Sequence, residues 1–172
     1  MEDVLIVDGD NIINSWPELI LLKNADYLHA RDRLVEILKD YQGLVLNNII
    51  IVFDAYNVKG GRGSRQEMDG VVVVHTQENE TADMYIEKLV GNLLPGKTTD
   101  KVVTVATSDR LEQGIIFGKG AYRVTPKELL HQIRMAKHAS SKHMSKGKIH
   151  FRMDTHIKHK VRDALERLRR GD

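Results

Sequence analysis

The chain has 172 residues, of which 41% are hydrophobic and 29% are charged, and its formal net charge is +2. This composition fits one globular domain with an appendage and excludes an intrinsically disordered main body. The chain contains no cysteine, which excludes disulfide bonds and cysteine-based zinc sites. No apolar run has the length of a membrane span, and residues 1–3 lead into a strand instead of a secretory signal. We therefore expect a soluble protein of the cytoplasm, or of an equivalent reducing organelle compartment, without membrane partners.

The first predicted strand, Val4–Val7, ends in a group of polar side chains. It consists of four apolar residues, too few for a helix, and Asp8, Asp10 and Asn11 follow it closely. Such a run is typical of a strand that is buried on both faces of a parallel sheet. Because ligands of open α/β sheets bind beyond the carboxyl ends of the strands, we expect these side chains to face a substrate or a metal ion.

Helices and strands alternate along the rest of the first 137 residues. In order, the sequence predicts a turn at 14–17, a helix over 27–41, a strand over 48–54, a loop over 57–70, a strand over 71–75, a helix over 80–94, a strand over 101–106, a helix over 111–117, a strand over 121–124 and a helix over 126–137. This alternation indicates an α/β domain with a mostly parallel sheet.

The end of the chain differs from the body in charge. Residues 138–172 hold ten Lys and Arg against four Asp and Glu, a balance of +6, which leaves −4 for residues 1–137. Residues 139–153 are polar and predict a linker, and residues 154–170 predict a helix with an apolar stripe at Ile157, Val161, Leu165 and Leu168. We therefore divide the chain into a domain at 1–138 and a basic end at 139–172. Packing of the stripe on the domain is the default and a partner surface is the alternative. The basic charge fits contact with a polyanion and a solvated terminal helix about equally well.

Acidic residues recur at the edge where the predicted strands end. Asp8, Asp54 and Asp109 each end or closely follow a strand, and Glu80 and Asp83 lie on one face at the start of a helix. Each has a structural alternative, since Asp109 could cap its helix, Asp54 could form a turn, and Glu80 and Asp83 could complement a helix dipole. Their recurrence at one edge favours a metal site, and oxygen ligands alone suit Mg²⁺ or Mn²⁺. Such ions activate water for attack on a phosphodiester.

Five motifs occur in order between residues 3 and 137. They are VDGDNII at 7–13, FDA at 53–55, ETAD at 80–83, ATSD at 106–109 and GAYR at 120–123. Together with the basic helical end, they resemble the YacP-like NYN family, a branch of the PIN-like nucleases. The resemblance implies a three-layer α/β/α domain and a Mg²⁺- or Mn²⁺-dependent endoribonuclease. Characterised bacterial relatives act on messenger RNA in association with ribosomes, so the resemblance also implies RNA and the ribosome as partners.

The resemblance also implies roles for single residues. Asp8 and Asp83 match the principal metal-site acids, Asp109 is expected as a further metal ligand, and Glu80 supports catalysis. Asn11 matches a polar residue that orients the substrate. This chain departs from the family at Asp10, where the family usually has Tyr. The extra carboxylate could join the metal shell, or it could face water and weaken substrate stacking.

Basic residues supply the candidate contacts with RNA. The loop at 60–65 lacks the Gly-Lys-Ser/Thr ending of a phosphate-binding P-loop, so its Arg62 and Arg65 are candidates for RNA phosphates instead, with a plain mobile loop as the alternative. Arg110, next to Asp109, is a further substrate-binding candidate. For docking on RNA or the ribosome, the candidates are Lys158, Lys160, Arg162, Arg167, Arg169 and Arg170.

Two other functions stay open from the sequence. The Asp-Gly-Asp of residues 8–10 is similar to the Asp-x-Asp of haloacid-dehalogenase phosphatases, although Asn11 and Ile12 fit that motif poorly. A catalytically idle module that binds RNA or the ribosome is the second alternative. The acidic group argues against it, since anions hinder RNA binding unless they hold a metal ion.

Overall fold

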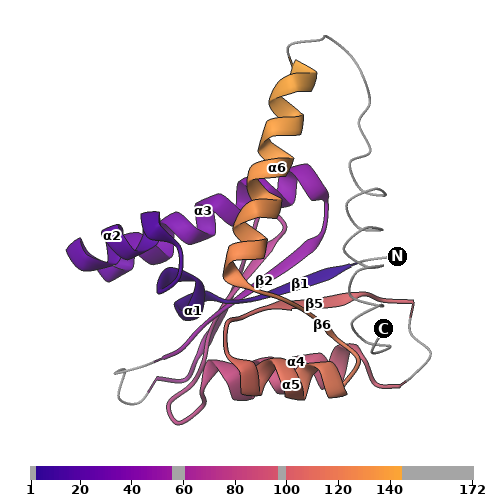
Figure 1. Cartoon of the computed structure of the whole chain (residues 1–172). Coiled ribbons are helices and arrows are strands. Elements are labelled where there is room, and N and C mark those ends of the chain that lie inside the picture. The colour runs from indigo at the N-terminus through magenta and orange to yellow at the C-terminus, as the bar shows by residue number, and fades with distance from the viewer. Residues whose placement is uncertain (1–2, 56–60, 97–99, 145–172) are drawn as a thin grey trace.

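Six strands form one sheet in the part of the chain that this computed structural model describes, residues 3–55, 61–96 and 100–144 (Figure 1). Their order across the sheet is β3-β4-β2-β1-β5-β6, and neighbouring strands are parallel except for β3 and β4. The strands are β1 (Val4–Asp8), β2 (Asn48–Phe53), β3 (Ser64–Met68), β4 (Val71–His75), β5 (Val103–Ala106) and β6 (Tyr122–Val124). The predicted α/β class with a mostly parallel sheet is confirmed.

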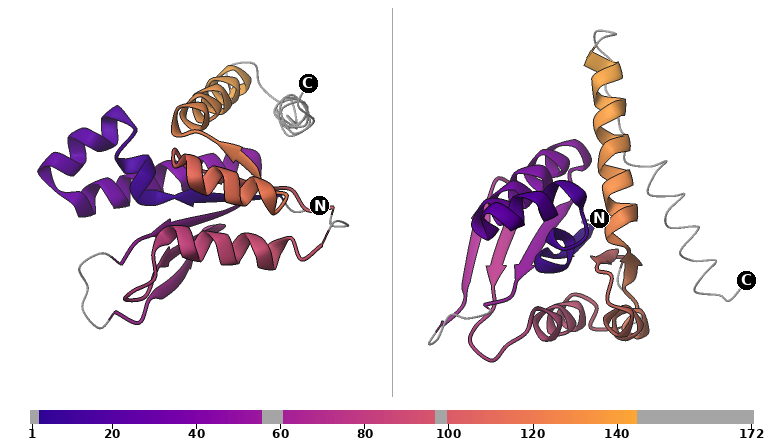
Figure 2. Two further views of the ribbon diagram at one scale, coloured as in Figure 1. Left: turned by 60° about the horizontal axis from the view of Figure 1, so that its bottom comes forward. Right: turned by 60° about the vertical axis from the view of Figure 1, so that its left-hand side comes forward.

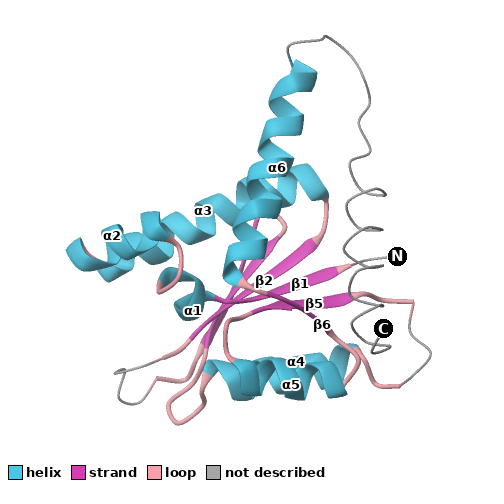
Figure 3. Ribbon diagram, in the orientation of Figure 1, coloured by secondary structure: helices cyan, strands magenta, loops and turns pink. Residues whose placement is uncertain are grey.

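Helices pack on both faces of this sheet, as the three-layer prediction requires. One face carries α1 (Gly9–Ile13), α2 (Pro17–Ala25), α3 (Tyr27–Val45) and α6 (Pro126–Met144), and the other carries α4 (Ala82–Leu93) and α5 (Arg110–Gly118). In Figure 1, α4 and α5 lie below the strands and α3 and α6 above them, and the right-hand view of Figure 2 keeps this separation. Figure 3 shows the same three layers by element type.

The side chains of β1 explain why both faces need helices. Leu5 and Val7 belong to the core beneath α1, α2, α3 and α6, whereas Val4 and Ile6 belong to the core beneath α4 and α5. Successive side chains of a strand point to opposite faces, so a strand without polar positions is buried on both. Because β1 lies between β2 and β5, its carboxyl end places Asp8 in the middle of the sheet edge.

The segment between β1 and β2 contains two helices that the sequence analysis did not predict. The predicted turn at 14–17 joins α1 to α2, and α2 begins at Pro17, a position where proline is favoured. α2 was not predicted because its apolar residues form a continuous run instead of a helical stripe. Only Leu19 of that run is fully buried. The turn itself is held by Trp16, whose indole Nε1 donates a hydrogen bond of 2.7 Å to the carbonyl of Pro126.

The loop predicted over 57–70 is wrong in its second half, where β3 pairs with β4 in an antiparallel hairpin. β3 is polar and almost entirely exposed, so it lacks the apolar alternation that predicts a strand. Its signal was the Asp69-Gly70 turn, in which both residues have positive φ angles of 49° and 79°. Such a pair is typical of a two-residue hairpin.

The last described helix is longer than predicted. α6 continues to Met144 instead of ending at Lys137, because residues 138–144 include no glycine or proline. The first part of the predicted linker is thus helical, whereas the division of the chain at residue 138 stays a prediction. The predicted helix over 154–170, with its six docking candidates, lies outside the described residues. No helix within the described ranges is long and apolar enough to cross a membrane.

Candidate metal centre

Three acidic side chains meet at the carboxyl edge of the sheet. One oxygen each from Asp8, Asp83 and Glu112 lies within 4.8 Å of the other two. Asp8 ends β1, Asp83 is in the first turn of α4, and Glu112 is in the first turn of α5. We call these residues the three-acid group. They come from three chain segments, so the fold and not the sequence spacing brings them together.

Helix caps fix the two acids that come from helices. The Thr81 hydroxyl accepts a hydrogen bond from the Met84 N–H (3.1 Å) and begins α4. Asp109 begins α5, since its Oδ1 accepts from the N–H groups of Leu111 (2.9 Å) and Glu112 (3.3 Å). Both caps place an acid in a first helical turn, where the helix dipole favours negative charge.

Burial makes the charged form of these acids unfavourable. Asp8 is 6% exposed, and burial, together with the charges of Asp83, Asp10 and Asp54, raises its pKa from the ordinary 3.8 to about 7. Glu112 is 5% exposed, and burial, with the charges of Asp8 and Asp83, raises its pKa from 4.5 to about 8. Burial also raises the pKa of Asp83. The group therefore resists ionisation unless a positive charge compensates it.

Glu112 has a further property that points to a cation. Neither of its buried carboxylate oxygens makes a hydrogen bond of ordinary geometry with a described residue, although Thr107 and Asp83 lie near enough to influence its pKa. An unpartnered buried carboxylate is costly, and such atoms are rare unless a ligand satisfies them. Three carboxylates with oxygens within 4.8 Å of one another offer hard oxygen donors, which suit Mg²⁺ or Mn²⁺ better than a metal that prefers nitrogen or sulfur. The residues present therefore fit such an ion.

Two predicted catalytic acids lie outside the three-acid group. Asp109 acts as the cap of α5, which was its structural alternative, and its charge contributes to the raised pKa of Asp83. Glu80 forms an ion pair of 3.2 Å with Lys88. Their catalytic roles, and the metal-ligand role of Asp109, stay predictions.

The predicted substrate-binding residues are distributed around the edge. The Asn11 side chain uses its Oδ1 to accept a hydrogen bond of 2.9 Å from the Ser108 N–H, so it ties α1 to the segment after β5. Arg62, Arg65 and Arg110 are exposed. Their contacts with substrate stay predictions.

Glu112 is the residue that sequence reasoning missed. It lies three positions after Asp109, the same spacing that drew attention to Glu80 and Asp83. Its helix is held from both sides, because Gln113 donates to the Thr107 carbonyl (2.7 Å) and Arg123 donates to the Gln113 side chain (2.7 Å). Arg123 of the GAYR motif, acting through Gln113, therefore supports the segment that carries Glu112.

Comparison with known proteins identifies the family of this chain. The family model described as the YacP-like NYN domain matches residues 5–170. The chain belongs to this family. One relative is the uncharacterized protein YacP of Bacillus subtilis (strain 168), which is 39% identical to this chain. The match covers 99% of this chain and 98% of YacP.

Solved structures of a YacP protein are similar to this chain in fold. The crystal structure of Rae1 (YacP) from Bacillus subtilis matches with a TM-score of 0.69 and 38% identity, covering 99% of this chain and 96% of that one. A single-residue mutant of Rae1 matches with a TM-score of 0.70 and 37% identity over the same shares. The resemblance inferred from the five motifs is confirmed, and so is the fold.

Proposed function

We propose that this protein is a metal-dependent endoribonuclease that hydrolyses RNA phosphodiesters. The observation that carries the proposal is the three-acid group, in which one oxygen of each acid lies within 4.8 Å of the others, while neither buried Glu112 oxygen makes a hydrogen bond of ordinary geometry in the described part of the chain. Membership of the NYN family, a branch of the PIN-like nucleases, supports it. The same membership speaks against the phosphatase alternative.

Asp8, Asp83 and Glu112 would hold the Mg²⁺ or Mn²⁺ ion. When bound, the ion supplies activation of water and stabilisation of the charge that develops on the phosphate. Asp8 and Glu112 carry raised pKa values of about 7 and about 8, so without a cation both are partly protonated at neutral pH, Glu112 more than Asp8, and they lose these protons when they become ligands. The proposed reaction is attack by water, which leaves 5′-phosphate and 3′-hydroxyl ends.

The test is incubation of the purified protein with RNA, with and without EDTA. We expect cleavage that EDTA abolishes and that Asp8→Asn and Asp83→Asn lose while their circular dichroism spectra remain those of the parent. Asp69→Asn is a matched control, since Asp69 is an exposed acid that pairs with Lys39 through a 3.3 Å contact. Cleavage that persists in EDTA, or ends with 2′,3′-cyclic phosphate, would contradict the proposal. Hydrolysis of a small phosphomonoester without RNA cleavage would favour the phosphatase.

The proposal includes messenger RNA and the ribosome as the setting of this cleavage. Few described side chains at the sheet edge are suited to reading bases, so the choice of cleavage site is better explained by where the enzyme is held. We propose that the basic end docks it on the ribosome, which places the protein in the cytoplasm or in an equivalent organelle compartment. Slow and loose cutting of naked RNA is expected, and robust sequence-specific cutting at physiological salt would contradict this part.

Co-sedimentation with ribosomes at several salt concentrations tests the docking. Binding that depends on phosphate neutralisation falls steeply as salt rises. Charge reversals at the six basic candidates of residues 158–170 are expected to weaken the association, and equal binding of parent and reversals would exclude this docking surface. A catalytically idle binding module would show the same co-sedimentation without EDTA-sensitive cleavage.

A further inference from the structure

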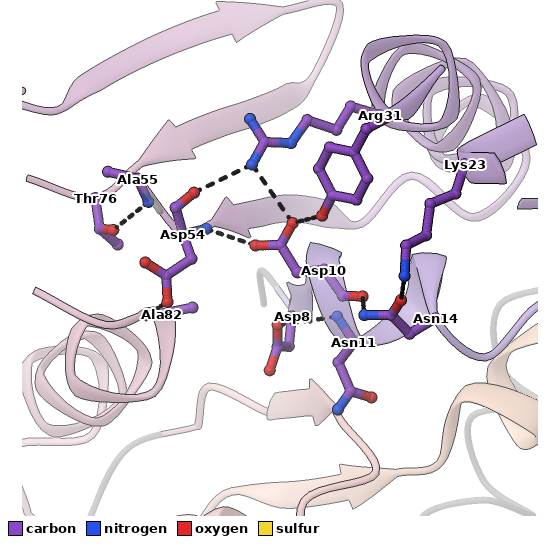
Figure 4. Close-up of polar contacts among 11 residues, drawn as sticks. Asp8, Asp10, Asn11, Asn14, Lys23, Arg31, Asp54, Ala55, Thr76 and Ala82 are labelled. Carbon is purple, nitrogen blue, oxygen red and sulfur yellow. Dashed lines mark hydrogen bonds and ion pairs between the residues drawn. The ribbon is translucent and has the colours of Figure 1, made fainter. Parts of the chain in front are cut away.

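Asp10 lies two residues after Asp8 but belongs to a different set of contacts. Asp8 ends β1 with extended backbone and caps α1, whereas Asp10 lies in the first turn of that helix, so the two side chains leave the chain from different backbone conformations. Figure 4 shows the Asp10 carboxylate directed to Asp54 and Arg31, away from Asp8. Asp10 is also absent from the three-acid group.

Both oxygens of Asp10 are engaged. Its Oδ2 accepts a hydrogen bond of 2.7 Å from the Asp54 N–H, and its Oδ1 accepts one from the Tyr27 hydroxyl and lies 3.5 Å from Nη2 of Arg31. We call Asp10, Tyr27, Arg31 and Asp54 the Asp10 network. The Asp10 carboxylate is thus compensated by one cation and two neutral donors.

Arg31 holds the other side of the Asp54 backbone. Its Nη2 donates a hydrogen bond of 3.1 Å to the Asp54 carbonyl, and its guanidinium lies over the rings of Tyr27 and Phe53, 4.9 Å from each centroid. The peptide groups on both sides of the Asp54 Cα are therefore held, one by Asp10 and one by Arg31. This leaves little freedom for the position of its side chain.

The Asp54 side chain passes this constraint to α4. Its Oδ2 accepts a hydrogen bond of 3.3 Å from the N–H of Ala82, the first residue of α4 and the neighbour of Asp83 (Figure 4). A series of hydrogen bonds thus leads from Asp10 through Asp54 to the helix that carries one of the three acids. Gly9 permits the close approach on which this depends, since a Cβ there would lie 2.4 Å from the buried ring of Phe53.

We infer that Asp10 is a positioning residue and not a metal ligand. Together with Arg31 it fixes Asp54, and Asp54 sets the start of α4 so that Asp83 stands beside Asp8 and Glu112. The sequence left open whether Asp10, the departure from the family, joins the metal shell. In this inference Asp10 supports the metal shell and does not belong to it. The catalytic meaning of this inference rests on the proposed function, whereas the hydrogen-bond series itself does not.

The experiment compares Asp10→Ala and Asp10→Asn with the parent through amide hydrogen exchange, Mn²⁺ affinity and RNA-cleavage kinetics. In Asp10→Ala, exchange at the Asp54 and Ala82 amides should accelerate. Since supporting residues of a metal site change metal affinity or activity by about 10–100-fold, we expect kcat to fall within this range while KM changes little. Asp10→Asn retains an acceptor for the Asp54 N–H and should restore most of kcat and of the amide protection.

Two further variants make the comparison specific. Glu18→Ala is the matched control, because Glu18 also pairs with an arginine of α3, Arg33, through a 2.7 Å contact that does not involve Asp54 or α4. It should leave exchange at Ala82 as in the parent. Arg31→Gln releases the Asp54 carbonyl and should accelerate exchange at Ala82 even if Asp10→Ala does not fold.

Distinct results overturn the inference. If Asp10→Asn weakens Mn²⁺ binding as much as Asp8→Asn does, Asp10 is a ligand. The hydrogen-bond series through Asp54 does not position α4 if amide exchange at Ala82 stays at the parent rate in both Asp10→Ala and Arg31→Gln. If Asp10→Ala does not fold, the parent rate in Arg31→Gln alone leads to the same conclusion. If the parent cleaves no RNA, the proposed function fails, and amide exchange and Mn²⁺ affinity still decide the role of Asp10.

Discussion

The three-acid group and the Asp10 network lie side by side at the end of β1, yet their carboxylates have opposite surroundings. In the three-acid group, the buried Asp8 and Glu112 lie beside the exposed Asp83, and neither Glu112 oxygen makes a hydrogen bond of ordinary geometry with a described residue. In the Asp10 network, the carboxylate accepts two hydrogen bonds and lies beside Arg31. Among the described side chains, carboxylates thus lie without a neighbouring cation in one place and beside a cation in the other. The difference indicates which acids are suited to bind a cation and which acids stabilise the fold.

The largest expected effect is on catalysis. Glu112→Gln should lower the rate of RNA cleavage at saturating Mn²⁺ by more than about 100-fold, because changes to supporting residues alone cost about 10–100-fold and Glu112 is proposed as a ligand. Single-turnover cleavage assays measure this. Asp109→Asn and Glu80→Gln should have smaller effects. Equal losses in all three variants would mean that the metal centre extends beyond the three-acid group.

The second effect is a dependence of stability on pH in the metal-free protein. Asp8 and Glu112 have folded-state pKa values of about 7 and about 8, above their ordinary values of 3.8 and 4.5. Between about pH 5 and 8 the folded state therefore binds protons that the unfolded state has lost, so the free energy of unfolding decreases as pH rises. The decrease should be on the order of a few kcal/mol.

Urea unfolding in EDTA at pH 5.5 and pH 8 measures this dependence. Addition of Mn²⁺ should stabilise the protein more at pH 8 than at pH 5.5, because the ligands are then already deprotonated. Glu112→Gln should make the metal-free pH profile flatter. A profile that rises toward pH 8 in EDTA would show that the three-acid group is compensated within the protein itself.

The third effect is a change in the free energy of unfolding, with opposite signs for variants of the three-acid group and of the Asp10 network. At pH 8 in EDTA, Glu112→Gln should raise the free energy of unfolding, since it removes a buried charge next to Asp8 and Asp83. Asp10→Ala should lower it by about 1–3 kcal/mol, because the partly buried N–H of Asp54 loses its acceptor. Denaturant titrations of both variants test this comparison. Changes of the same sign would remove the distinction between the groups.

The smallest effect concerns the outer support of Glu112. Arg123 is exposed and donates to Gln113, which keeps its own bond to the Thr107 carbonyl when Arg123 is absent. Arg123→Ala should therefore change the free energy of unfolding by less than about 1 kcal/mol, as is usual for surface contacts. Thermal unfolding is sufficient to measure it. A larger loss of unfolding free energy would show that the surface contact of Arg123 is important for the stability of the segment after β5.

The apolar strands were predictable because they carry their own signal. β1, β2, β4 and β5 are runs of mainly β-branched residues that end near polar positions, and the structure places each of them within the sheet. β3 was missed because its pairing, and not its composition, makes it a strand. α1 was missed because it has only five residues and begins at a cap, Asp8, that also reads as a strand end.

The candidate site was predictable in part for a similar reason. Asp8 and Asp83 follow strand and helix boundaries, which sequence patterns locate well. Glu112 lies inside a helix start, where an acid is usually explained by the dipole, and only the contact with β1 and α4 distinguishes it. The partners of Asp10 come from residues 27, 31 and 54, and no spacing in the sequence predicts that these meet.

The polar strand β3 also bears on how the protein behaves in concentrated solution. β4 contains four consecutive valines, Val71–Val74, an uncharged segment of the kind that adds to strands of other molecules when its backbone is open. β3 occupies that backbone and presents Arg65 and Glu67 to solvent, while the opposite edge, β6, has only three residues. Charged and short edge strands prevent sheets from joining edge to edge. The hairpin at Asp69-Gly70 therefore protects the protein against aggregation, a property separate from any chemistry at the sheet edge.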